Sequence, residues 1–207
     1  MPLLKIMLFV LLLLAMSWTL YRQYMRRMHG IDSMNVYRLR LNGTPVYTRL
    51  RKFIKAHGLP PAAAIRREPV PIDFPEDLRS LVERAHSTGD ELDLCYEGVT
   101  MNYFHGERLV ITSIDFRKTD WGLDYKGWRF DRNFTYSDFC ELFPLSSAMD
   151  ISGIGVQSLF EINTGEWVPS SESYMVERWS KTNLFAHPTV EFTFLEGKLI
   201  YIFFANF

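Results

Sequence analysis

Four aspartates, Asp115, Asp120, Asp124 and Asp131, form the densest group of side chains in this sequence that could do chemistry. Carboxylate oxygens are the ligands that Ca²⁺ prefers in proteins. Calcium loops, however, need a fixed ligand spacing that this run does not have. Trp and Lys residues alternate with the aspartates in predicted turns. The sequence therefore favours a solvated acidic surface over a metal site.

The histidines do not form a catalytic or metal-binding pattern. Metal binding or base catalysis would need a second histidine at i, i+4 spacing or a nearby carboxylate. We take all five as isolated, because no two of them are spaced i, i+4: His29, His57, His86, His105 and His187. Gly153-Ile154-Gly155 lacks the third glycine and the helix start of a nucleotide-binding loop. We predict no catalytic residue, no metal site and no cofactor, and no small-molecule substrate is identified.

Aromatic side chains are the remaining candidates for function. Tyr and Trp often anchor protein interfaces when they lie in loops or at strand ends. Trp121, Tyr125 and Trp167 each sit beside Gly or acidic residues in a predicted loop. We predict that these three bind a protein partner. The competing interpretation is that such rings fill the core of a small domain.

The elements that would position these residues alternate between strands and helices. Short turns at Glu97-Gly98 and His105-Gly106 predict an antiparallel meander, which can keep one face of its sheet open. Periodicity and turn residues predict strands at 36–41, 92–96, 99–104, 108–116, 128–134, 189–195 and 198–207, and helices at 46–57, 73–88 and 135–143. Thr135 and Asp138 match a capping box at the start of the last helix.

Two stretches of the chain resemble each other. Residues 37–53 and 128–144 align without a gap, and the alignment pairs Arg38 with Arg129, Asn42 with Asn133 and Thr44 with Thr135. A tandem repeat would place one α/β unit at 31–117 and a second at 118–207. Chance similarity between amphipathic segments is the alternative, and a register that pairs Glu97-Gly98 with Glu196-Gly197 competes for the same strands.

The amino-terminal segment is strongly apolar. Residues 6–20 carry no charge, and with Leu3, Leu4 and Tyr21 the run reaches about the 20 residues that a bilayer needs. Ala15-Met16-Ser17 is a poor signal-peptidase site, because it lies inside the apolar run. We predict an uncleaved transmembrane helix over residues 3–21, within an anchor and basic juxtamembrane segment at 1–30.

Charge is divided unevenly along the chain. Residues 22–67 hold eleven Lys or Arg against one Asp, whereas residues 68–207 hold eleven basic and twenty-three acidic residues, a net charge of −12. The basic residues after the apolar run favour a cytoplasmic globular part on a bacterial inner membrane, with the periplasm as the alternative. The acidic part should repel nucleic acid and attract a protein partner with a basic face.

A tandem unit of helix and antiparallel strands behind an export-like segment resembles three protein types in layout. These are the duplicated modules of β-lactamase inhibitor proteins, the single module of the lipoprotein BamE, and small bacterial toxin-immunity proteins. The likeness covers residues 36–207 and rests on no diagnostic motif, and the lipoprotein cysteine of BamE is missing. The resemblance implies a non-enzymatic module that binds another protein on an open sheet face.

The expected fold is therefore α+β, with an N-terminal transmembrane helix followed by a tandem repeat of helix packed on antiparallel sheet. The expected function is a membrane-anchored, non-enzymatic protein-binding module, namely an immunity or inhibitor protein that neutralises a secreted toxin. An envelope assembly factor and an enzyme without a recognisable motif are the alternatives. Perturbed titratable groups converging in one pocket would favour the enzyme.

Overall fold

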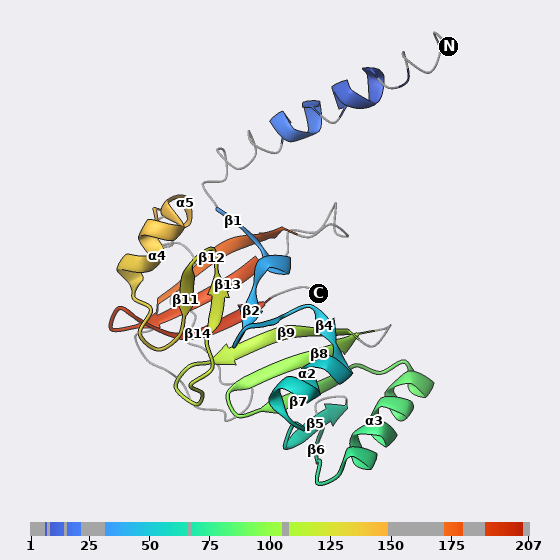
Figure 1. Ribbon diagram of the computed structural model, residues 1–207. Helices are drawn as coiled ribbons and strands as arrows, with labels where there is room; N and C mark the ends of the chain where they lie inside the picture. The colour runs from blue at the N-terminus through green and yellow to red at the C-terminus, as the bar shows by residue number, and fades with distance from the viewer. Residues whose placement is uncertain are drawn as a thin grey trace.

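Antiparallel strands make up most of the structure, which is a computed structural model (Figure 1). It describes residues 7, 9–14, 16–21, 32–65, 68–104, 108–148, 172–179 and 189–204. In this part of the chain the strands form one sheet of ten and one of four.

The larger sheet runs through most of the described chain. Its order is β1 (Ser33–Asn35), β12 (Glu172–Trp179), β13 (Thr189–Leu195), β14 (Lys198–Phe204), β9 (Arg108–Asp115), β8 (Val99–Phe104), β7 (Leu92–Tyr96), β5 (Ala62–Ile65) and β6 (Glu68–Pro71), with β4 (Thr48–Arg49) paired to β9. All pairs are antiparallel except β1 with β12. The meander and the terminal hairpin predicted from the sequence are confirmed.

The smaller sheet joins two distant segments of the chain. Its order is β11 (Trp128–Phe130), β10 (Leu123–Tyr125), β2 (Arg40–Leu41) and β3 (Thr44–Pro45). Its tight turns are Asn42-Gly43 and Lys126-Gly127, and all four turn residues have positive φ. Two consecutive positive φ values are what a type I′ hairpin turn requires. Residues 40–45 are thereby held beside residues 123–130.

The helices of the described chain are few. They are the 3-10 turn η1 (Val36–Arg38) and the α-helices α2 (Leu50–His57), α3 (Pro75–Thr88), α4 (Tyr136–Leu142) and α5 (Pro144–Ser147). Of these, α2 and α3 each end at a glycine with positive φ, Gly58 and Gly89. At α4 the Asp138 N–H donates to Thr135 Oγ1 (3.2 Å), and the Thr135 N–H donates to Asp138 Oδ2 (2.8 Å). The predicted capping box is confirmed.

The core lies on one face of the larger sheet. Alternate strand residues share a face, and Leu92 and Leu94 of β7 are fully buried while Asp93 between them is half-buried. On the buried face α2 contributes Phe53 against Tyr96. Figure 1 shows α4 and α5 far from α3, at the other end of the sheet. The other face carries polar pairs, such as Asn102 with Asp93 and Ser173 with Thr193.

The expected α+β fold class is wrong, because the described chain is mostly antiparallel sheet with a few short helices. The alignment behind the tandem repeat also pairs a strand residue with a helix cap. Thr44, which the alignment pairs with the helix cap Thr135, lies in strand β3, and α2 begins only at Leu50. The Val46 N–H donates to the Leu39 carbonyl (3.2 Å), so the first predicted helical turn is tied to an extended segment instead. Residues on both sides of 117 also share one sheet through β9 and β14. The division into units 31–117 and 118–207 stays a prediction, because a shared sheet can join two units.

The expected transmembrane helix over residues 3–21 is also wrong. Among the described residues, no helix combines the length and the apolar character that crossing a bilayer requires. The single-pass, inner-membrane localisation that rested on this helix is overturned with it.

The two cysteines, whose pairing the sequence leaves open, are free thiols. Cys95 in β7 and Cys140 in α4 are both half-buried rather than fully buried. Burial, with a smaller contribution from the Asp93 carboxylate, raises the pKa of the Cys95 thiol, which disfavours the reactive thiolate.

Candidate functional site

Trp121 lies at the surface in a cluster of four rings. It is half-buried in the loop between β9 and β10, and its ring centroid lies 4.9 Å from His57, 5.2 Å from Tyr96 and 6.2 Å from Phe53. We call these four residues the ring cluster. Phe53 and His57 come from one face of α2, and Tyr96 is the last residue of β7. Three segments far apart in sequence therefore build one aromatic cluster, in which Phe53 is fully buried and the other three rings are half-buried.

Hydrogen bonds fix the two polar rings of the ring cluster. His57 Nε2 lies 2.9 Å from Thr44 Oγ1, and Tyr96 Oη donates to the Gly58 carbonyl (3.0 Å). Burial lowers the pKa of His57 and raises the pKa of Tyr96 well above its ordinary value. Both shifts favour the neutral form. At neutral pH the ring cluster is thus an uncharged, rigid surface.

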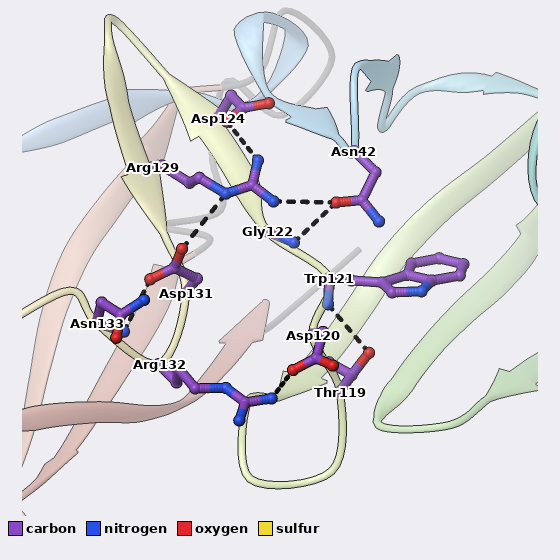
Figure 2. A network of polar contacts seen from close by, with 10 residues as sticks. All are labelled: Asn42, Thr119, Asp120, Trp121, Gly122, Asp124, Arg129, Asp131, Arg132 and Asn133. Atoms are coloured by element: carbon purple, nitrogen blue, oxygen red, sulfur yellow. Dashed lines mark hydrogen bonds and ion pairs between the residues drawn. The ribbon is translucent and has the colours of Figure 1, made fainter.

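A reciprocal pair of hydrogen bonds holds the backbone beside Trp121, and Figure 2 draws the one from Gly122 to the Asn42 side chain. The Gly122 N–H donates to Asn42 Oδ1 (3.0 Å), and the Asn42 N–H donates to the Gly122 carbonyl (2.9 Å). The Trp121 N–H donates to Thr119 Oγ1 (3.2 Å). Asn42 has φ of 44°, a left-handed conformation that Asn tolerates better than most residues. The β2–β3 turn thereby locks the loop that carries Trp121.

Arg129 ties this lock to the acidic residues. Its guanidinium lies 3.1 Å from Asp124 and 3.3 Å from Asp131, and it donates to Asn42 Oδ1 (3.3 Å). A Cβ on Gly122 would overlap the same guanidinium. The glycine therefore leaves the space that the Arg129 guanidinium occupies, and Figure 2 shows the two side by side.

The aspartates expected to form a solvated acidic surface are each paired with a basic side chain. Asp120 pairs with Arg132, and Asp115 Oδ2 lies 2.7 Å from Arg117 and 3.6 Å from Lys118. Among the described residues no group of three or more His, Cys, Asp or Glu side chains is placed to hold a metal ion.

The three predicted partner-binding residues differ in their exposure to solvent. Trp121 is accessible, whereas Tyr125 is 1% exposed, and its ring lies 6.4 Å from both Phe130 and Phe143 in the core. Trp167 lies outside the described residues.

Sequence reasoning missed His57, Tyr96, Asn42 and Arg129 as parts of the site. The sequence marked Asn42-Gly43 only as a turn, and nothing local indicates that its amide reaches Gly122, eighty positions away.

Comparison with protein-family models, with curated proteins and with solved structures finds no match for this chain. The geometry of the site therefore carries the functional argument alone.

Proposed function

We propose that this chain is a non-enzymatic protein-binding module and that the ring cluster around Trp121 is its contact surface. The observation that carries the proposal is a half-buried tryptophan that packs against three other rings, in a loop whose backbone is fixed by hydrogen bonds. Binding energy in protein interfaces is concentrated in a few residues, and Trp and Tyr are enriched among them.

Rigidity of the free surface supports this proposal. A side chain that is loose before binding loses rotamer freedom on association, which costs about 0.5–1.5 kcal/mol for each immobilised group. Trp121 is already held by ring contacts, and its backbone is held through Thr119, Asn42 and Gly122. A partner would therefore meet a surface that needs little ordering.

The charge around the ring cluster is asymmetric. Glu97 is exposed in the turn after Tyr96, whereas the Asp120 side chain, although 85% exposed, pairs with Arg132. On the other side, α2 presents Lys52 and Lys55 to solvent. The net charge of −12 over residues 68–207 leads us to propose that the partner has a basic face. Such complementarity mainly raises the association rate.

A capture experiment with the full chain as bait tests this function. Trp121→Ala should abolish or strongly weaken capture of a protein with a basic surface, and Trp128→Ala should leave it intact. Trp128 is the matched control because it is also half-buried but packs on Phe134 in the smaller sheet. Equal capture by the wild type and Trp121→Ala would refute the proposed surface, and capture of nucleic acid alone would refute the function.

The class of partner follows from the same experiment. The layout resemblance implies an immunity or inhibitor protein, so a captured toxin that loses activity in the complex would support that role. A captured envelope-assembly component, with no inhibition, would support the assembly factor instead.

A further inference from the structure

A small cavity lies at the C-terminal end of α3, away from the ring cluster. Its volume is about 190 Å³, and it is lined by Ala85, His86, Gly89, Asp90, Glu91, Asn102 and Tyr103. The cavity adjoins the start of β7 at Leu92, whereas the ring cluster takes Tyr96 from the end of that strand. The two features are therefore separate surfaces of one strand.

The electrostatics of this cavity favour a positive charge. Asp90 and Glu91 contribute two carboxyl groups, and α3 ends at Thr88 with its Gly89 cap in the left-handed conformation (φ 71°). The carbonyl groups of the last helical turn carry the negative end of the helix dipole, which interacts favourably with cations. The charged groups and the dipole thus have the same sign.

The polar aromatic wall of the cavity complements a cation. His86 Nε2 lies 3.3 Å from Tyr103 Oη, and the two rings meet edge to face with centroids 5.9 Å apart. Tyr103 is 7% exposed and packed in the core, so its position is fixed. A tyrosine ring attracts a cation at its face, and the hydroxyl oxygen can accept a hydrogen bond from one.

Size and donor set narrow the kind of cation. Pockets for small molecules usually measure about 300–1,000 Å³, so about 190 Å³ suits a single group rather than a whole metabolite. Within the described residues, no three His, Cys, Asp or Glu side chains are placed to hold a metal ion, and this holds for His86, Asp90 and Glu91 as well. An organic cation fits this geometry better than a metal ion.

We propose that this cavity binds one alkylammonium or guanidinium group, and that its source is a Lys or Arg side chain of the partner protein. The assignment of the cation to a partner side chain rests on the proposed function, because a partner with a basic face presents such side chains. The cation site itself rests only on the cavity. A free amine has the same chemistry, so the experiment must distinguish it from a side chain of the partner protein.

Titration of the isotope-labelled full chain with n-butylammonium tests the site by NMR. We expect saturable shifts of the Gly89 and Glu91 amide signals, and no saturable shift with uncharged n-butanol. Glu91→Gln should weaken binding about tenfold, because the ammonium group loses its charge-assisted hydrogen bond to the carboxylate. Glu83→Gln, which changes another exposed carboxylate of α3, is the matched control and should bind as the wild type does.

The outcomes separate the site from the source and from the proposed function. No saturable shift with n-butylammonium, or equal binding by the wild type and Glu91→Gln, would overturn the site while capture through Trp121 could still succeed. If Glu91→Gln weakens both n-butylammonium binding and the affinity for the captured partner, the source is the partner's side chain. If it weakens only n-butylammonium binding, the site stands, and the assignment to the partner is overturned.

Discussion

Trp121 and Tyr125 are four residues apart, and both have the sequence context of a loop anchor, yet the structure gives them opposite roles. Tyr125 lies in β10 with its hydroxyl accepting from the Asn35 N–H (3.2 Å) and its ring among Phe130 and Phe143. Trp121 stays at the surface. An acidic or glycine neighbour therefore does not distinguish a surface aromatic residue from a buried one.

The difference follows from strand alternation. Leu123 and Tyr125 of β10 point to the same side and are 0% and 1% exposed, while Asp124 between them pairs with Arg129. The pairing of β10 with β2 fixes that side toward the core. Trp121 precedes the strand, so no alternation constrains it, and its position depends on contacts with α2 and β7.

The largest expected effect is that of Tyr125→Ala on stability. Removing a fully buried ring leaves a cavity, and we expect a loss of about 3–5 kcal/mol in the free energy of unfolding. Urea denaturation followed by circular dichroism measures it. Tyr125→Phe is the control and should lose only about 1 kcal/mol, for the bond from Asn35. If Tyr125→Ala loses less unfolding free energy than Tyr125→Phe is expected to lose, the assignment of Tyr125 to the core is contradicted.

Trp121→Ala should reduce partner binding more than it reduces stability. We expect a loss of about 2 kcal/mol or more in binding free energy for the captured partner, if Trp121 is a true anchor. The loss in unfolding free energy should be smaller than for Tyr125→Ala, about 1–2 kcal/mol, because the ring is only half-buried. Calorimetry gives the first value and urea denaturation the second. If Trp121→Ala loses as much unfolding free energy as Tyr125→Ala, Trp121 is a core residue like Tyr125 and the proposed difference is wrong.

Thr135→Ala tests how much the cap of α4 contributes to the stability of the core around Tyr125. Thr135 caps α4, and the chain directly after α4 supplies Phe143 to the surroundings of Tyr125. Loss of the cap should reduce the unfolding free energy by about 1 kcal/mol. Ser137→Ala, an exposed change in the first turn, should have almost no effect, and thermal denaturation compares the two.

Gly122→Ala and Arg129→Gln test the lock on the surface side. An alanine Cβ would displace the Arg129 guanidinium, so both variants disrupt the same contacts with Asn42, Asp124 and Asp131. These ion pairs are partly exposed, so we expect about 0.2–1 kcal/mol for the arginine change. In a double-mutant cycle the two losses should not add. Full additivity in urea denaturation would show that the glycine and the arginine act separately.

The smallest expected effect is the pH dependence from His57. Burial lowers its folded-state pKa, so the stability from its neutral form is present above the unfolded-state pKa of about 6.5 and is lost as pH falls below it. We expect a small decline in stability from about pH 7 to pH 5 that His57→Gln diminishes. Denaturation at several pH values measures it, and an unchanged slope in the variant would contradict the prediction.

Local patterns predicted much of the fold. Alternation and tight turns placed the strands around 92–115 and the terminal hairpin, and the capping box placed α4, because each signal lies within a few residues. The helical spacing from Val46 onward failed at its start, since a bond to Leu39 draws Val46 into extended structure.

The candidate site was mostly beyond sequence reasoning. Only Trp121 was named in advance, because the ring cluster joins residues 57, 96 and 121, and the lock joins Asn42 to Arg129. No local pattern encodes such pairings. They depend on how β2 and β10 meet in the smaller sheet.

Strand β6, at one border of the larger sheet, has the sequence Glu-Pro-Val-Pro. Pro69 and Pro71 alternate along it, and neither has an N–H, so only Glu68 and Val70 can donate hydrogen bonds toward β5. The outward side of β6 then has no N–H at the two proline positions to offer another extended chain. A second molecule cannot continue the ladder there, which protects this border against the strand-to-strand stacking that begins fibril growth.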